Sequence, residues 1–271
     1  MSQRASAILL LMLTAAVAVL FCFLPRIPQP DVYHQFADRR SVLGIPDFAN
    51  VASNLPFAVI GIWGLLFLLR SGRNKVPAHF VEPGEQWPYL LVFVGVLLTA
   101  FGSSYYHLSP NNSRLVWDRL PMTIAFMSMV ASVIAERISL RAGLWLLPIL
   151  VLIGMGSVLQ WYSTEIRGAS DLRFYAAVQL YSALVLLLAL CLPQRYTRGS
   201  DLAIVVVFYA LAKLFEAFDK PIFAAGRIVS GHTLKHFAAA AAGYCILRML
   251  QKRRPLSVTS GENRFARLPL S

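Results

Sequence analysis

Long apolar runs are the feature of this sequence that most limits its fold. Eight windows approach the roughly 20 residues that a helix needs to cross the hydrocarbon core of a bilayer. They cover residues 6–24, 48–69, 88–107, 118–136, 142–161, 173–192, 201–218 and 229–250. Backbone groups in lipid must be satisfied internally, and no segment alternates in the manner of a barrel strand. The sequence therefore predicts an all-α, multi-pass transmembrane helical bundle.

The first window divides the chain into a seven-helix core and one N-terminal helix. This window follows Arg4, exceeds the usual length of a secretory h-region and ends in Phe21 and Phe23, with no small-x-small cleavage site before Pro25. We therefore expect a signal anchor that is retained. The predicted organisation is a signal-anchor helix and loop over 1–46, a seven-helix core over 47–250, and a basic, disordered tail over 251–271.

The net charge of +12 reflects membrane topology rather than a nucleic-acid partner. In an eight-helix chain, 14 Lys and Arg residues fall on the side of the two termini and nine in the opposite loops. Cytoplasmic loops carry the excess of Lys and Arg. We therefore expect an integral membrane protein with both termini in the cytoplasm. The sequence gives no indication of its oligomeric state.

Three histidines lie inside or at the ends of predicted spans, where ionisable groups are costly and indicate function. His107 ends the third window, and His232 and His236 lie near the start of the last one. In an up-and-down bundle these two window ends share a membrane face, opposite to the termini. The other two histidines, His34 and His79, fall in loops, where we expect solvated side chains.

The spacing of the last two histidines is typical of a metal site. His232 and His236 are i and i+4, so both imidazoles lie on one side of their helix. A network of hydrogen-bonded histidines is the alternative explanation. With His107 at matching depth, three neutral imidazoles would leave a fourth zinc position open, which is the coordination of a catalytic zinc.

Two further polar residues share this face of the predicted bundle. Ser103 lies one turn before His107 on the same side of the helix. Its hydroxyl either points toward whatever His107 binds or donates a hydrogen bond to a carbonyl of its own helix. Asp118 begins the fourth window. It could be an N-cap, or it could form an ion pair with Arg119 or Arg114. Alternatively, it is a base that takes a proton from metal-bound water. We take both as candidate catalytic residues.

Other uses of the polar residues fit less well. Haem is disfavoured because two histidines one turn apart on a single helix cannot be opposite axial ligands of one iron. A metal transporter would need ligands through the full membrane depth, whereas these histidines lie at one end. The group Lys213, Glu216 and Asp219 reads as an intramembrane ion pair and is left out of the site.

The combined pattern resembles the alkaline ceramidase family, within the superfamily of adiponectin-receptor-like proteins. The resemblance consists of the SxxxH of Ser103 and His107, Asp118 eleven residues on, the HxxxH of His232 and His236, and the stretch DFANVASNLPF over 47–57. Order and spacing agree over residues 47–250. The resemblance implies a seven-helix intramembrane zinc amidase in which the three histidines bind zinc, Asp118 shuttles a proton and Ser103 steadies the oxyanion.

The sequence departs from that family in two ways. It has an additional helix before the core, and the first loop lacks the family's acidic, calcium-binding cluster. Only Asp47, and more loosely Asp38, could fill equivalent places as calcium ligands. Calcium is therefore a doubtful second cofactor.

These observations predict a zinc-dependent enzyme that hydrolyses the N-acyl bond of ceramide or a related N-acyl lipid to an amine lipid and a fatty acid. An apolar cavity within the core would hold the acyl chain of this membrane-lipid substrate. The alternative is a receptor or sensor of the same superfamily that holds zinc without turnover.

Overall fold

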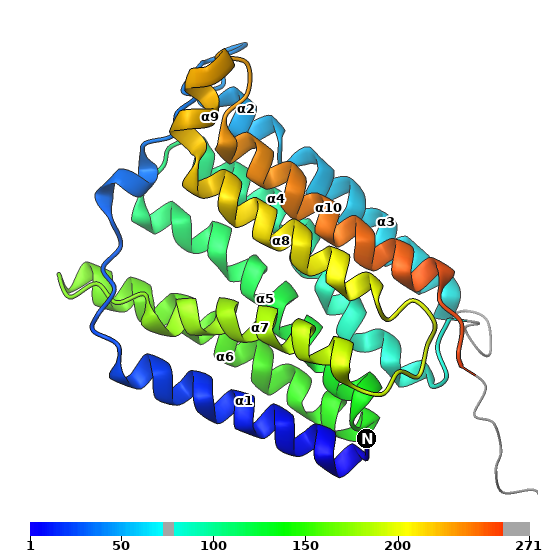
Figure 1. The fold of residues 1–271 in the computed structure, drawn as a ribbon. Helices are drawn as coiled ribbons and strands as arrows, with labels where there is room; N and C mark the ends of the chain where they lie inside the picture. Colours follow the sequence, from blue (N-terminus) through cyan, green and yellow to red (C-terminus); the bar gives the residue numbers. More distant parts are fainter. Residues whose placement is uncertain (73–78, 257–271) are drawn as a thin grey trace, which may run out of the picture.

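The computed structural model describes residues 1–72 and 79–256 (Figure 1). These residues form ten α-helices, two short 3-10 helices and no β-strand. The helices are α1 (Gln3–Phe23), α2 (Phe48–Ala52), α3 (Leu55–Gly72), α4 (Gln86–His107), α5 (Asn112–Arg137), α6 (Leu140–Ile166), α7 (Arg173–Cys191), α8 (Asp201–Ala217), α9 (Asp219–Gly226) and α10 (Gly231–Lys252). The 3-10 helices are η1 (Asp31–His34) and η2 (Pro83–Glu85). The predicted all-α bundle is confirmed.

Six helical segments of the described residues are long and apolar enough to cross a membrane. They are Gln3–Phe23, Phe48–Arg70, Pro83–His107, Asn112–Arg137, Leu140–Ile166 and Arg173–Cys191. Two of the eight predicted spans, 201–218 and 229–250, are not among them, so this count differs from the predicted eight. The first forms α8, with only 17 residues, and the second forms α10, whose apolar run is interrupted by His232, Lys235 and His236. Both helices still belong to the bundle, where α10 packs against α8 and α3 (Figure 1).

Two local departures from the predicted windows shape the end of the bundle that holds the histidines. The window 48–69 is broken between α2 and α3, where Pro56 lies in the first turn of α3, a position that proline tolerates. The break leaves Ser53 and Asn54 as a short connection between the two helices. Residues after 218, which the windows leave as a connection, form α9.

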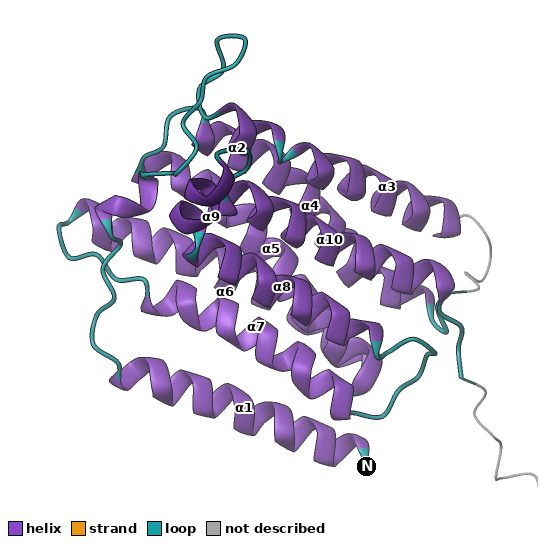
Figure 2. Cartoon of the chain, turned by 45° about the horizontal axis from the view of Figure 1, so that its top comes forward, coloured by secondary structure: helices purple, strands orange, loops and turns teal. Residues whose placement is uncertain are grey.

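The N-terminal helix lies at the edge of the bundle beside α7 (Figures 1 and 2). The hydroxyls of Thr14 and Tyr181 are 3.0 Å apart, and Arg173 donates a hydrogen bond of 2.7 Å to the carbonyl of Leu24. The chain that follows α1 runs along one end of the bundle to α2, so the N-terminal segment also contacts the other helices there (Figure 1). Figure 2 shows that the loops gather at two ends of the bundle.

The end of the bundle that contains the N terminus is closed by a buried ion pair. Arg253 is 1% exposed, forms a short ion pair with Glu136, and lies over the ring of Tyr196 at 4.1 Å. The backbone of Arg254 accepts a hydrogen bond of 2.9 Å from Thr197. Residues 251–256, assigned above to a disordered tail, are therefore packed on the bundle. The rest of that predicted tail, 257–271, lies outside the described residues.

Candidate metal centre and lipid cavity

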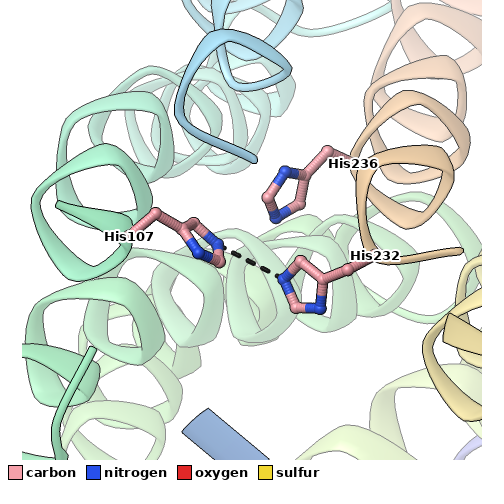
Figure 3. A group of neighbouring side chains, drawn as sticks. All are labelled: His107, His232 and His236. Carbon is pink, nitrogen blue, oxygen red and sulfur yellow. Dashed lines mark hydrogen bonds between the residues drawn. The ribbon is translucent and has the colours of Figure 1, made fainter. Parts of the chain in front are cut away.

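Three imidazoles from two helices converge at the opposite end of the bundle. His107 is the last residue of α4, and His232 and His236 lie in the first two turns of α10 (Figure 3). One ring nitrogen of each residue lies within 4.8 Å of the others, and the Nε2 atoms of His107 and His232 are 3.3 Å apart. All three side chains are buried. This group could hold a metal ion, as the spacing predicted.

The local sequence explains why α10 begins at Gly231, just before the two histidines. Ser230 caps the helix by accepting a hydrogen bond from the backbone of Thr233. The next residue is Gly231, where a Cβ atom would lie 2.3 Å from the carbonyl oxygen of Phe215. Only glycine therefore permits this close approach to α8. The following turn carries both His232 and His236 on the face toward α4.

The hydrogen bonds of the histidines fit a metal site. The hydroxyl of Ser53 donates its single proton to the carbonyl of Asn50 at 3.0 Å, so its oxygen accepts from Nδ1 of His236 at 2.7 Å. That bond leaves the Nε2 lone pair of His236 free, in the pattern of metal-binding histidines. Nδ1 of His107 is buried without a partner among the described residues. An unsatisfied nitrogen argues against a self-sufficient network of hydrogen-bonded histidines.

A loop residue covers the histidines. The ring of Phe36 is 6% exposed, and its centroid lies 4.7 Å from that of His107 and 4.4 Å from that of His232. Asp219 holds this loop in place, since its carboxylate accepts hydrogen bonds from the backbone of Ala37 at 2.8 Å and of His232 at 2.7 Å. The group is thus shielded on one side by an aromatic ring.

Sequence reasoning missed Phe36, Ser53 and Asp219 as neighbours of the histidines. Ser53 lies in the stretch that carries the family resemblance, but its spacing alone gives no partner. His34 is also more engaged than a solvated loop residue. Its ring nitrogens lie 2.8 Å from the hydroxyl of Tyr106 and 2.9 Å from the amide oxygen of Asn112.

Ser103 and Asp118 come together because α4 and α5 cross closely. A Cβ atom on Gly102 would lie 2.0 Å from the carbonyl oxygen of Trp117, so the two backbones are in contact beside these residues. Both side chains are buried and line the same cavity as His236. This geometry places a hydroxyl and a carboxylate on the wall of the cavity that His236 also lines.

The structure does not support the two simpler explanations for Asp118, an N-cap or an ion pair with Arg119 or Arg114. Helix α5 begins at Asn112 and is capped by Asn111, so Asp118 lies within the helix and is not an N-cap. Among the described ion pairs, none involves Asp118. Arg119 instead donates a hydrogen bond of 2.6 Å to Gln29 and stacks on Trp161. Asp118 is thus a buried residue that lines the cavity.

The cavity has a volume of about 380 Å³, lies between the helices and meets the histidine group at His236. Most of its lining is apolar, with side chains such as Val96, Met129 and Leu186 from α4, α5 and α7. Ile27 and Tyr33 line it as well, so the segment after α1 forms part of its wall. A long, mostly apolar cavity suits an alkyl or acyl chain.

The charged group of α8 belongs to this cavity, contrary to its exclusion from the site above. Lys213 pairs with Glu216 at i, i+3, as predicted, and Lys235 of α10 joins the pair with a 3.0 Å contact to Glu216. All three residues line the cavity. Asp219 takes no part in the ion pair and bonds to backbone groups instead.

The two candidate calcium ligands have other surroundings. Arg40 donates to Asp38 through Nε at 2.8 Å and Nη2 at 2.6 Å, and these hydrogen bonds hold the pKa of the Asp38 carboxyl below its usual value. Asp47 precedes α2 in a left-handed conformation, with φ of 45°, and makes no capping hydrogen bond. Burial raises the pKa of its carboxyl. Among the described residues, the histidine triad is the group that could hold a metal ion, and calcium at Asp38 and Asp47 stays a prediction.

Fold and site together define a polytopic helical membrane protein with a buried three-histidine group beside an apolar cavity. The model of the Ceramidase family matches residues 44–218, which is more than half of the chain. The chain therefore belongs to the Ceramidase family, as the resemblance predicted, and membership supports hydrolysis of a ceramide-like amide. The match ends before α10, so His232 and His236 lie outside it. No curated protein matches the sequence.

Proposed function

We propose that this protein is an intramembrane zinc-dependent amidase that hydrolyses the N-acyl bond of ceramide or a related N-acyl lipid. The observation that carries the proposal is the convergence of His107, His232 and His236 within 4.8 Å, next to an apolar cavity that His236 lines. Membership in the Ceramidase family supports the reaction class. Three imidazole nitrogens are a ligand set typical of catalytic zinc.

The three histidines would hold the metal, with Ser53 fixing the ring of His236 in the tautomer that leaves Nε2 free. When bound, zinc supplies Lewis-acid activation of water and of a carbonyl group. The Phe36 ring excludes bulk water from one side of the group. These features favour a pre-organised, partly dry site.

The reaction adds water across the amide bond and yields a carboxylic acid and an amine. A carboxylate oxygen of Asp118 would accept the proton that the attacking water loses and deliver it to the amine nitrogen as the carbon–nitrogen bond breaks. The hydroxyl of Ser103 would donate a hydrogen bond to the oxyanion that forms at the carbonyl oxygen. The apolar cavity would hold the acyl chain and place the amide at these groups.

The proposal is tested on purified protein by zinc content and by hydrolysis of N-acyl lipids, for the wild type and for His107→Ala, His232→Ala and His236→Ala. We expect about one zinc per chain, and loss of both zinc and hydrolysis in each variant. His79→Ala is the matched control, because His79 lies outside the triad and contacts the backbone of Arg253. Unchanged zinc content in all three variants would refute the proposal. Zinc binding without turnover is the result expected of the receptor alternative.

A further inference from the structure

The inner wall of the cavity carries an ionic cluster, defined here as Lys213, Glu216 and Lys235. The side chains of Glu216 and Lys235 are 18% and 14% exposed, whereas that of Lys213 is 52% exposed. All three line the cavity that also contains Ser103 and Asp118. Buried charges are costly, so a cluster of this kind in an apolar cavity calls for a reason.

Both oxygens of the Glu216 carboxylate already accept hydrogen bonds. It accepts from Lys213 through one oxygen, and from Lys235 at 3.0 Å and the hydroxyl of Tyr33 at 3.1 Å through the other. Burial raises the pKa of Tyr33 to about 12, so its hydroxyl stays protonated and acts as the donor. Each acceptor oxygen of the cluster therefore already has at least one donor.

Donors, by contrast, remain available. An ammonium group has three N–H donors, and Glu216 is the partner of Lys235 among the described hydrogen bonds. Two lysines and one carboxylate carry a net charge of +1. With Arg119 and Asp118, which also line the cavity, the sum stays at +1. The guanidinium of Arg119 donates to Gln29 through Nη2 and lies over the rings of Trp161 and Tyr175, while its Nη1 is buried without a hydrogen-bond partner among the described residues.

We propose that Lys235, assisted by Lys213, is a binding site for an anionic group of the lipid, a carboxylate or phosphate. A cluster with free donors and a surplus cation recognises acceptor oxygens with negative charge. This inference rests on the proposed function for the location of the substrate, and it narrows the substrate class to N-acyl lipids with an acidic headgroup. The carboxylate of the released fatty acid is the other source of the same chemistry.

Binding is measured with chelator present, so that no turnover is needed. The probes are N-palmitoylglycine and its neutral counterpart N-palmitoylethanolamine, and separately palmitate and palmitamide. We expect the wild type to bind N-palmitoylglycine about 10-fold or more tightly than the ethanolamine compound, because a hydrogen bond to a charged group adds that much affinity. Lys235→Met should remove this preference, and Lys213→Met should reduce it less.

Two further variants sharpen the test. Glu216→Gln removes the negative charge from the cluster and should increase the preference for the anion, opposite in sign to Lys235→Met. Lys220→Met on α9 is the matched control, because Lys220 is exposed and does not line the cavity. Its preference should equal that of the wild type.

The outcomes separate the two sources and the two proposals. A preference for N-palmitoylglycine that depends on Lys235 supports an acidic headgroup. A Lys235-dependent preference for palmitate alone supports the same site with the fatty acid as its ligand. Equal binding of charged and neutral probes by the wild type, or a preference unaffected by Lys235→Met and Glu216→Gln, overturns the inference. The binding experiment does not depend on hydrolysis. If the protein binds the charged probe selectively but hydrolyses no N-acyl lipid in the separate activity assay, only the proposed function is refuted.

Discussion

The hydroxyl oxygen of Ser53 lies 2.7 Å from Nδ1 of His236, and the same hydroxyl lies 3.0 Å from the carbonyl oxygen of Asn50. This chain of two hydrogen bonds links the break between α2 and α3 to the histidine group on α10. Since the backbone carbonyl can only accept, the direction of both bonds is set. The break in the helix thus determines which nitrogen of His236 is free.

Replacing Ser53 by alanine should weaken zinc binding about 10-fold to 100-fold, the usual effect of losing a hydrogen bond to a metal-binding histidine. The ring of His236 would lose its fixed tautomer while keeping its place on the helix. Competition with a zinc-sensitive chelator measures the change. The matched control is Ser132→Ala, a buried serine that bonds to the carbonyl of Met129 in its own helix. Equal zinc affinity in the two variants would contradict the prediction.

Replacing Phe36 by alanine should open the histidine group to solvent. The ring contacts both His107 and His232, so its loss leaves space through which water and chelators can reach them. We expect faster release of bound zinc to a chelator, together with a loss of stability of about 3–5 kcal/mol, as for other buried phenylalanines. Phe36→Leu keeps an apolar side chain and should lie between the two. A release rate equal to that of the wild type would show that the ring does not control access.

Asp219 should act as a positioning residue through its two backbone hydrogen bonds. Asp219→Ala removes both bonds, whereas Asp219→Asn keeps one acceptor oxygen. Each lost bond to a charged group leaves a backbone N–H unsatisfied and costs about 1–3 kcal/mol. Thermal unfolding in detergent should therefore rank the wild type above Asp219→Asn and Asp219→Ala last. Equal melting temperatures for all three would exclude this role.

The sequence carries information about the parts of the site that depend on helical periodicity. His232 and His236 are four residues apart, and Lys213 and Glu216 are three apart. With 3.6 residues per turn, each pair is expected on one face of its helix, and the side chains of each pair are close together in the structure. The position of His107 follows from the up-and-down order of the helices. These relationships are local or topological, so a single sequence suffices to predict them.

Other neighbours of the histidines could not be predicted, because they arise from contacts between distant segments. Phe36 and Ser53 lie in a loop and in a helix break, whose paths depend on the packed bundle. The ion pair between Lys235 and Glu216 could not be predicted for the same reason, since the two residues belong to different helices. The number of long apolar helices differs from the predicted eight at α8 and α10, because α8 has only 17 residues and α10 carries His232, Lys235 and His236.

The ion pair of Asp38 and Arg40 should make the loop over the histidines sensitive to acid. The hydrogen bonds from Arg40 lower the pKa of Asp38 in the folded protein. A carboxyl whose pKa is lower when folded stabilises the protein above its unfolded pKa of about 3.9, and this contribution is lost as pH falls through the lower folded value. Melting temperature should therefore drop at low pH.

Arg40→Gln should remove part of this acid sensitivity, because Asp38 would lose the hydrogen bonds that lower its pKa. The variant should already be less stable at neutral pH, and its melting temperature should change less between pH 6 and acid conditions. Arg198→Gln, which breaks the exposed pair with Asp201, is a suitable comparison. Identical pH profiles for the wild type and Arg40→Gln would contradict the assignment.

Asp118 should be needed for hydrolysis and dispensable for metal binding. Asparagine has nearly the same shape but cannot accept and return a proton, so Asp118→Asn should lower the rate by about 10²-fold to 10⁴-fold, the usual contribution of general acid–base catalysis. Zinc content should stay at the wild-type level, because the three imidazoles are unchanged. Asp201→Asn, in the pair with Arg198 and outside the cavity lining, should retain wild-type activity. If Asp118→Asn lost zinc in proportion to activity, the carboxylate would support the metal site and would not transfer the proton.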